Sequence, residues 1–215
     1  MGKVVRAVMA MKIEIRDGSV HIEGYVNAVG RDSRVLFDRG GKFVEQVKPG
    51  TFQRSLAKGN NVELRVNHDY AIGSLGKGNL TLKEDSIGLY AAADTDDANV
   101  RAAAEAGTLR GWSFGFYANA ESNEPTTRED VQRRFLEDID LVEVSVLTNK
   151  TPAYVGTSIE ARADDGKHTE IRSFGDDEVE TVDLRQKDND NAEGRALFYS
   201  LTAAEIELLK LKKRG

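Results

Sequence analysis

The chain has 215 residues, 40% of them hydrophobic, which is enough for one globular domain with a sizeable core. Its 36 acidic and 30 basic residues leave a formal net charge of −6, which argues against nucleic acid or an anionic membrane as a partner. The absence of cysteine excludes disulfides, thiolate catalysis and cysteine-based metal sites, so any metal would depend on three histidines and the carboxylates. Proteins or small molecules are the expected partners.

The N-terminal stretch MGKVVRAVMAMKIEIR is interrupted by Lys3, Arg6 and Lys12, so it lacks the continuous apolar core of a signal peptide. Arg6 also breaks the pattern for N-myristoylation, and no long apolar run occurs anywhere in the sequence. We therefore expect a soluble, intracellular protein.

From residue 12 to about residue 160, apolar and polar residues mostly alternate with a period of two, which is typical of half-buried strands. The strand candidates, bounded by Gly, Asn and Asp, are KIEIR, SVHIEGYV, NVELRVN, NLTLKE, SIGLYAAAD, GWSFGFYANA and DLVEVSVLT. The pattern predicts a sheet-rich, barrel-like core in one domain over residues 1–162.

Two short helices are predicted within this domain. One covers residues 51–58 after a Pro-Gly pair, and the other covers residues 96–106, with Thr95 as N-cap and Gly107 as the C-terminal stop. Residues 119–134, NAESNEPTTREDVQRR, are so polar that we expect an exposed loop.

The composition changes after Arg162. Residues 163–195 are dominated by Asp, Glu, Lys, Asn and Gly, and this predicts a disordered or loosely ordered acidic linker. Residues 196–215 contain a capping box at Thr202 and Glu205, several leucines, and a run of lysines that suits a helix C-terminus. We expect an amphipathic C-terminal helix that docks on a partner.

Ser113 lies in the stretch LRGWSFGFYA and raises the question of a serine nucleophile, which needs a neighbouring base and an acid that orients the base. Of the three histidines, His68 is the best candidate base, because it follows an alternating strand and lies between polar residues in NHD. The spelling GWSFG matches the nucleophile-elbow motif, but a strand continues through it, so that interpretation fails. Gly111 and Gly115 would leave space beside Ser113 for a substrate backbone.

The strand DLVEVSVLT offers two candidates for the acid. Glu143 is the more unusual, because a carboxylate inside an apolar strand is costly to bury unless another group pairs with it. Asp140 stands at the entrance of the strand and is the alternative third member. A glycosidase pair or a metal site finds little support, because DTDDAN has no histidine at ligand spacing.

The segments ELRVNHDY, GTLRGWSFGFYA and DLVEVSVLTNKTPAY occur in the order and spacing of the tailed-phage prohead (capsid maturation) protease family, which the chain resembles over residues 12–160. The resemblance implies a serine endopeptidase with a fold like that of herpesvirus assemblin, a closed antiparallel β-barrel flanked by short helices. It also implies Ser113 as nucleophile, His68 as general base and Glu143 as the acid, with Asp140 as the alternative, and no metal or cofactor.

The same resemblance implies where the protein would act and on what. It would be enclosed in the assembling prohead in the host cytoplasm, and would cut scaffold protein or the scaffolding segment of the major capsid protein, and then itself. The oxyanion would be bound by backbone N–H groups near Ser113 or in residues 149–153. A homo-oligomer is possible, and the alternative function is a non-catalytic barrel of the same fold that acts as a scaffold or binding protein.

Overall fold

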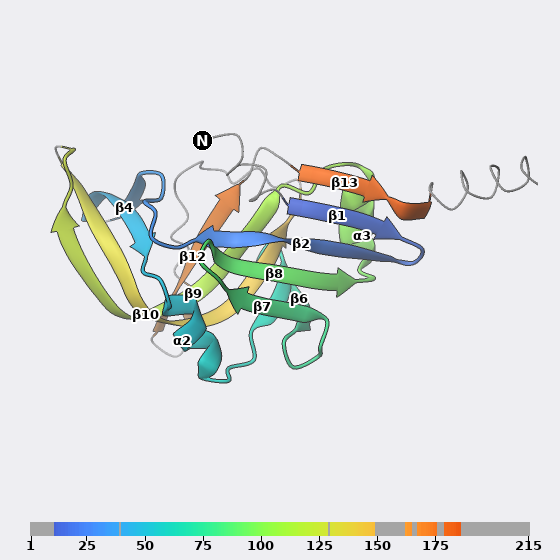
Figure 1. Ribbon diagram of the computed structural model, residues 1–215, viewed down its shortest axis with the longest axis horizontal. Coiled ribbons are helices and arrows are strands. Elements are labelled where there is room, and N and C mark those ends of the chain that lie inside the picture. Colours follow the sequence, from blue (N-terminus) through green and yellow to red (C-terminus); the bar gives the residue numbers. More distant parts are fainter. Residues whose placement is uncertain are drawn as a thin grey trace, which may run out of the picture.

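The computed structural model describes residues 11–38, 40–128, 130–148, 162–164, 167–175 and 179–185 (Figure 1). In chain order the elements are β1 (Met11–Arg16), β2 (Ser19–Ala28), β3 (Leu36–Asp38), β4 (Gly41–Val47), α2 (Thr51–Ala57), β5 (Glu63–Val66), β6 (Tyr70–Ser74), β7 (Leu80–Glu84), β8 (Gly88–Thr95), α3 (Ala98–Glu105), β9 (Gly111–Pro125), β10 (Val131–Leu147), β11 (Arg162–Asp164), β12 (Lys167–Gly175) and β13 (Val179–Asp183). The described structure is thus mainly β with two helices, as the alternation predicted.

The strands form two sheets. The first has the order β13-β1-β2-β8-β7, and all of its neighbours are antiparallel except β1 and β13. In β2 the alternation places Val20, Ile22 and Val26 on the buried face, where all three are fully buried. The strict period of two in the sequence therefore reflects one solvated face and one face in the core.

The second sheet has the order β11-β12-β9-β10-β4-β3 and is organised around the long strand β10. β9 pairs with β10 along its length, while the first half of β10 pairs with β4 and the second half with β5, both in parallel. Among the described strands, β6 pairs with β5 alone. β10 therefore links the hairpin β5–β6 to the strand β9, and this link positions the candidate site.

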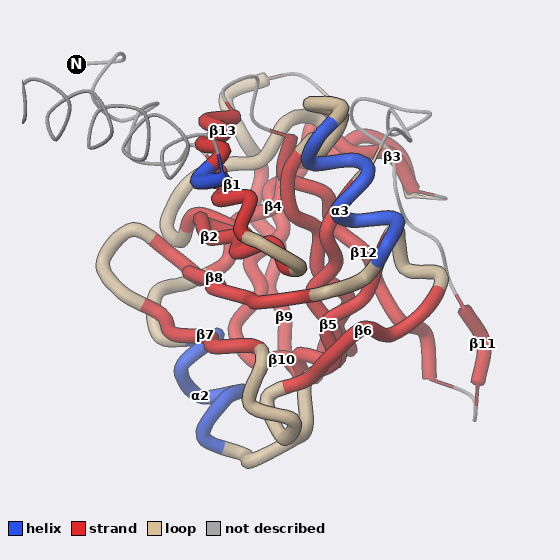
Figure 2. Tube along the Cα trace, turned by 90° about the vertical axis from the view of Figure 1, so that its right-hand side faces the viewer, coloured by secondary structure: helices blue, strands red, loops and turns tan. Residues whose placement is uncertain are grey.

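The two sheets pack face to face around one hydrophobic core (Figures 1 and 2). The predicted closed antiparallel barrel is wrong. Neither sheet closes on itself in the described residues; β7 and β13, for example, are the edges of the first sheet. The sheets are also not purely antiparallel, since each contains a parallel pair. Closure needs a continuous ladder between the outermost strands, and alternation in a sequence does not specify which strands pair.

The exposed loop predicted for residues 119–134 is also wrong over most of its length. β9 continues to Pro125 and β10 begins at Val131, so these polar residues form the far end of a long hairpin. Their side chains are accommodated by ion pairs such as Arg133–Asp32 and Arg133–Glu124, both at 2.7 Å. A ladder with paired charges on its surface does not require apolar alternation.

The two helices lie near the predicted positions, at opposite ends of the sheets (Figure 2). The N-cap of α3 is Asp97 and not Thr95, because the Asp97 carboxylate accepts the N–H groups of Asn99 and Val100 at 3.0 Å. The Thr95 hydroxyl instead accepts the N–H of Asp97 itself.

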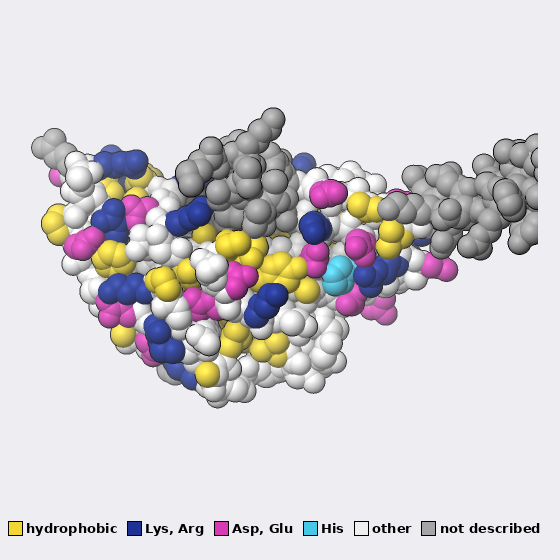
Figure 3. Space-filling model, in the orientation of Figure 1, with side chains coloured by type: hydrophobic (Ala, Val, Ile, Leu, Met, Phe, Trp, Pro, Cys, Tyr) yellow, Lys and Arg dark blue, Asp and Glu magenta, His cyan; other side chains and the backbone are white. Residues whose placement is uncertain are grey.

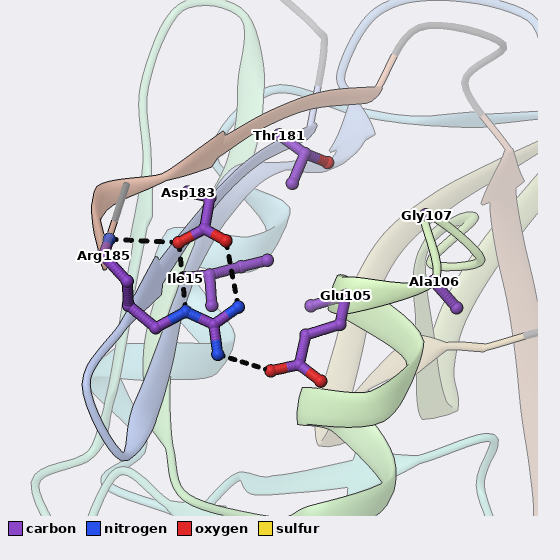
Figure 4. A pocket seen from close by; sticks show the side chains of 8 residues that line it. Ile15, Glu105, Ala106, Gly107, Thr181, Asp183 and Arg185 are labelled. Carbon is purple, nitrogen blue, oxygen red and sulfur yellow. Dashed lines mark hydrogen bonds and ion pairs between the residues drawn. The ribbon is translucent and has the colours of Figure 1, made fainter. Parts of the chain in front are cut away.

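The acidic segment after Arg162 contains regular structure where it is described. β12 pairs with β9 and β13 pairs with β1, so the predicted disordered linker over residues 163–195 is wrong for these strands. Arg185 fixes the end of β13 through ion pairs with Asp183 and Glu105, in a pocket beside Ile15 (Figure 4). Pairing with β9 and β1, together with ion pairs, stabilises these strands although they contain few large apolar residues. Residues 186–215, including the predicted C-terminal helix, lie outside the described residues.

On the face drawn in Figure 3, acidic and basic side chains are interspersed with hydrophobic ones. No helix among the described residues is long and apolar enough to cross a membrane.

Candidate active site

His68 lies in the tight turn between β5 and β6. The turn is closed by a hydrogen bond from the Asp69 N–H to the Val66 carbonyl at 2.8 Å. Both central residues have positive φ, 51° at Asn67 and 63° at His68, which is the pattern of a type I′ turn. A histidine in this conformation is unusual and is held there by its surroundings.

Asn67 fastens this turn to the end of β10. Its side-chain amide donates to Thr148 Oγ1 at 2.8 Å and its carbonyl oxygen accepts the Thr148 N–H at 3.0 Å. The backbone N–H of Asn67 also donates to the Val146 carbonyl at 3.0 Å. Asn is among the residues that best tolerate positive φ, so Asn67 both forms the turn and anchors it.

Ser113 is completely buried near the beginning of β9, opposite Ser145 of β10. Its Oγ lies 2.7 Å from Nε2 of His68. The strand continues through Ser113 to Phe114 and Phe116, which are also fully buried and face the core. Ser113 is therefore presented by a regular strand, and the imidazole reaches it from the β5–β6 turn.

Glu143 completes the arrangement from the second half of β10. Its Oε1 lies 2.5 Å from Nδ1 of His68, and its side chain is only 8% exposed. A neutral imidazole that donates its Nδ1 proton to this carboxylate leaves Nε2 free to accept the Ser113 proton. Ser113, His68 and Glu143 thus form a continuous chain of short contacts.

Gly115 lies opposite Glu143 in the sheet, and its lack of a side chain makes room for the carboxylate. A Cβ at position 115 would stand 2.8 Å from Cγ and 3.0 Å from Oε1 of Glu143. The expectation that Gly115 leaves space for a substrate backbone is therefore replaced by a different role. The absence of a Cβ at Gly115 leaves the space in which the Glu143 side chain lies when it contacts His68.

Two supporting residues were not identified from the sequence. Arg65 of β5 places its Nε 2.9 Å from Oε2 of Glu143, so the buried carboxylate has a cationic partner. Ser145 Oγ accepts the backbone N–H of His68 at 3.2 Å and lies 3.3 Å from its Nδ1. Alternation places Ser145 on the same strand face as Glu143, and this could have indicated that it lies near the site. Nothing in the sequence around Arg65 indicates its contact with Glu143.

Asp140, the alternative acid, belongs to a different cluster. Its carboxylate lies 2.7 Å from Nζ of Lys58, which also contacts Asp138 at 3.0 Å. The hydrogen bond to Asp140 raises the pKa of Lys58 above its ordinary value. The structure brings Glu143, and not Asp140, into hydrogen-bond contact with His68.

A family model described as caudovirus prohead serine protease matches residues 7–172, more than half of the chain. The chain belongs to this family. No curated protein and no solved structure matches it, so the expected likeness to herpesvirus assemblin is not confirmed. The matched range includes all three members of the Ser113–His68–Glu143 chain.

In this member of the prohead serine protease family, β12 covers the nucleophile candidate. The Ser113 hydroxyl lies within hydrogen-bond distance of the Arg172 carbonyl, at 2.8 Å. The Arg172 side chain is buried and its Nε and Nη2 each lie 2.7 Å from an oxygen of Glu45. Neither residue was singled out from the sequence: Arg172 stands in a polar stretch, and Glu45 follows Phe43 and Val44 in a segment that was not among the strand candidates.

The other two histidines lie elsewhere. His21 of β2 lies 2.9 Å from Asp94, on the first sheet. His168 falls in β12, and its side chain is outside the described residues. In the part of the chain that the structure describes, no group of three or more His, Asp and Glu side chains could hold a metal ion.

Proposed function

We propose that this protein is a serine endopeptidase in which Ser113 is the nucleophile, His68 the general base and acid, and Glu143 the carboxylate that orients His68. The observation that carries the proposal is the pair of contacts on the His68 ring, 2.7 Å from Nε2 to Ser113 Oγ and 2.5 Å from Nδ1 to Glu143 Oε1. This arrangement of residue types is that of a catalytic triad. Membership of a serine protease family supports the same assignment.

In the proposed reaction, Nε2 of His68 takes the Ser113 proton while Oγ bonds to the carbonyl carbon of the scissile peptide. The tetrahedral intermediate then collapses: the C–N bond breaks, and His68 gives its proton to the leaving amine. Water, activated by the same imidazole, releases the acyl group and restores the Ser113 hydroxyl. Glu143 stabilises the imidazolium that exists between the two transfers.

The buried ion pair between Glu143 and Arg65 holds the carboxylate in place, which the orienting role requires. The proposal needs no cofactor. Of the donors expected to bind the oxyanion, residues 149–153 lie outside the described residues.

The family indicates a role in capsid maturation inside the phage prohead. We propose that the substrates are scaffold protein or the scaffolding segment of the major capsid protein, met inside the assembling prohead in the host cytoplasm. The predicted C-terminal helix over residues 196–215, with four basic residues among its last six, would bind capsid or scaffold.

Co-expression with the capsid protein from the same operon tests the substrate assignment. We expect wild type to shorten the capsid or scaffold protein and Ser113→Ala to leave it intact, with both outcomes read as intact masses. Cleavage that persists in Ser113→Ala, in a host lacking its major proteases, would reject Ser113 as nucleophile. An intact capsid protein beside a wild-type enzyme that labels with a fluorophosphonate would reject the substrate and not the chemistry.

Self-cleavage is a separate part of the proposal. We expect wild type to accumulate a fragment that ends between Arg162 and Arg195, and Ser113→Ala to remain full length. Intact-mass analysis of the two purified proteins, and of proheads that contain them, measures this directly. If both proteins stay full length even in proheads, self-cleavage is wrong.

A further inference from the structure

β12 lies alongside the strand that carries Ser113. It runs antiparallel to β9 on the side opposite β10, with Cα partners from Glu170 and Phe116 at one end to Gly175 and Gly111 at the other. Many domains bind an extended peptide by adding it as a strand to the edge of a sheet, where main-chain hydrogen bonds supply affinity. On β9 that edge is already taken by a segment of the same chain.

The backbone of β12 also meets the nucleophile itself. The Arg172 carbonyl lies 2.8 Å from Ser113 Oγ, and Ser113 is completely buried. A hydroxyl has one proton, so Ser113 cannot donate to this carbonyl and to Nε2 of His68 at the same time. β12 therefore competes with the general base for that proton and excludes any second peptide from the same place.

The side chain of Arg172 is buried against the carboxylates of Glu45 and Glu170. Glu45 of β4, itself 4% exposed, faces the guanidinium with both carboxylate oxygens, and the Phe116 ring centroid lies 5.3 Å from the guanidinium carbon. Burial lowers the pKa of Arg172, but the charges and hydrogen bonds of Glu45 and Glu170 together outweigh it, so the pKa is raised. A two-point contact of this kind with a planar cation favours Arg over Lys.

Two further residues, Glu170 and Arg134, join the ion pair between Arg172 and Glu45. Glu170 contacts Arg172 at 2.6 Å and is bound on its other side by Arg134. Arg134 in turn reaches Glu45 at 3.1 Å. Two carboxylates and two guanidinium groups therefore tie β12 to β4 and β10. Removing one of them should weaken the attachment of β12 without removing any member of the proposed triad.

We propose that β12 occupies the substrate groove along β9, and that Glu45 is the specificity-determining residue, which selects a basic side chain at the residue whose carbonyl meets Ser113. This inference rests on the proposed function, since it takes Ser113 as the nucleophile. It follows that the form with β12 in place is closed to other peptides, and that cleavage of another chain requires β12 to leave. Substrates with Arg at this position are preferred, and the bond Arg172–Ser173 is the candidate for self-cleavage.

The first test measures access to Ser113 with a serine-directed fluorophosphonate on full-length protein. We expect Arg172→Ala to label at least about tenfold faster than wild type, equivalent to about 1.4 kcal/mol less stability of the closed form. Arg133→Ala is the matched control, because it removes an ion-paired arginine of the same sheet that pairs with Asp32 and Glu124. It should label at the wild-type rate. Equal rates for wild type and Arg172→Ala, with cooperative unfolding of both, would overturn the inference.

The second test asks whether Glu45 selects a basic side chain in a bound peptide. A peptide with the sequence of residues 167–176, KHTEIRSFGD, is added to the Arg172→Ala protein during labelling. It should slow the labelling of Ser113, whereas the same peptide with Arg172→Glu should not. If both peptides protect equally, or neither does, Glu45 does not select the basic side chain. If no form of the protein labels at all, the proposed nucleophile fails and the inference fails with it.

Discussion

The two halves of β10 differ in how far their charged residues are buried. In the first half, Arg133, Asp138 and Asp140 form ion pairs with partners that remain partly exposed. In the second half, residues 141–147, Glu143 is the one charged residue, and its side chain is 8% exposed. Water can stabilise the charges of the partly exposed residues, whereas a buried carboxylate depends on the protein groups around it. Glu143 has two such groups, the His68 ring and Arg65.

The register of β10 explains why the halves differ. The first half pairs with β4 and the second with β5, so the second half alone lies next to the turn that bears His68. Irregularities at Leu136–Ile139 and between Leu141 and Glu143 break the strict alternation between the halves. A carboxylate a few residues earlier on the same strand therefore reaches Lys58 and not the imidazole.

The largest expected effect comes from removing the groups that Glu143 serves. Ser113→Ala and His68→Ala should each lower kcat by on the order of a millionfold, because the hydroxyl and the base act as one unit. Both variants should remain folded, since alanine fits a buried strand and the β5–β6 turn is also held by Asn67. The measurement is hydrolysis of a capsid-derived substrate together with a urea unfolding curve. The comparison requires that both variants fold. Because the two groups act as one unit, the double variant should then be no slower than either single one.

The second prediction sets the two halves of β10 directly against each other. Glu143→Gln should lower kcat by about 10⁴-fold, because an amide can leave His68 in the wrong tautomer. Asp140→Asn should change kcat less than about threefold, since its partner Lys58 lies in another cluster. Both substitutions remove one charge and keep the shape, so each is the control for the other. The opposite ranking would show that the acid comes from the first half of the strand.

The sequence allowed the candidate site to be predicted better than the sheets around it. Ser113, His68 and Glu143 stand in short motifs whose residue types already imply the chemistry, and the structure places them in contact. Barrel closure could not be deduced, because it depends on which distant strands pair. A period of two gives the face of each residue and leaves its neighbouring strand open.

Polar composition was the main source of error. Few large apolar residues occur at residues 119–134 and in β12, so the composition predicts a loop and a linker where the structure has strands. Their side chains are instead neutralised in pairs, as Arg172 is by Glu45. Such pairs join residues far apart in the chain, and a single sequence gives no sign of which charges will meet.

A third prediction concerns the geometry that lets Glu143 reach His68. Gly115→Ala would place a Cβ 2.8 Å from Glu143 Cγ, so the carboxylate must shift away from the imidazole. We expect a loss of on the order of a hundredfold in kcat, typical of a catalytic group displaced by about 1 Å. Gly78→Ala is the stability control. At Gly78 the added Cβ would meet no atom within 4 Å, and the cost comes from the positive φ of 78° alone, away from the triad. Equal activity losses in the two variants would show that Gly115 matters only for folding.

The smallest expected effect comes from Lys58, which lies at the end of α2 and pairs with Asp138 and Asp140 in the first half of β10. Lys58→Met removes contacts to Asp138 and Asp140 on a side chain that is 34% exposed, so we expect a loss of about 1 kcal/mol or less in the free energy of unfolding and an unchanged kcat. The hydrogen bond to Asp140 raises the folded pKa of Lys58 above 10.5. Its contribution is therefore complete below the unfolded pKa and is lost as the pH rises through the folded pKa. Urea unfolding of wild type and Lys58→Met at neutral pH and above pH 11 should show a difference that shrinks at the higher pH. A difference that stays constant would assign the effect to packing of the lysine stem and not to its charge.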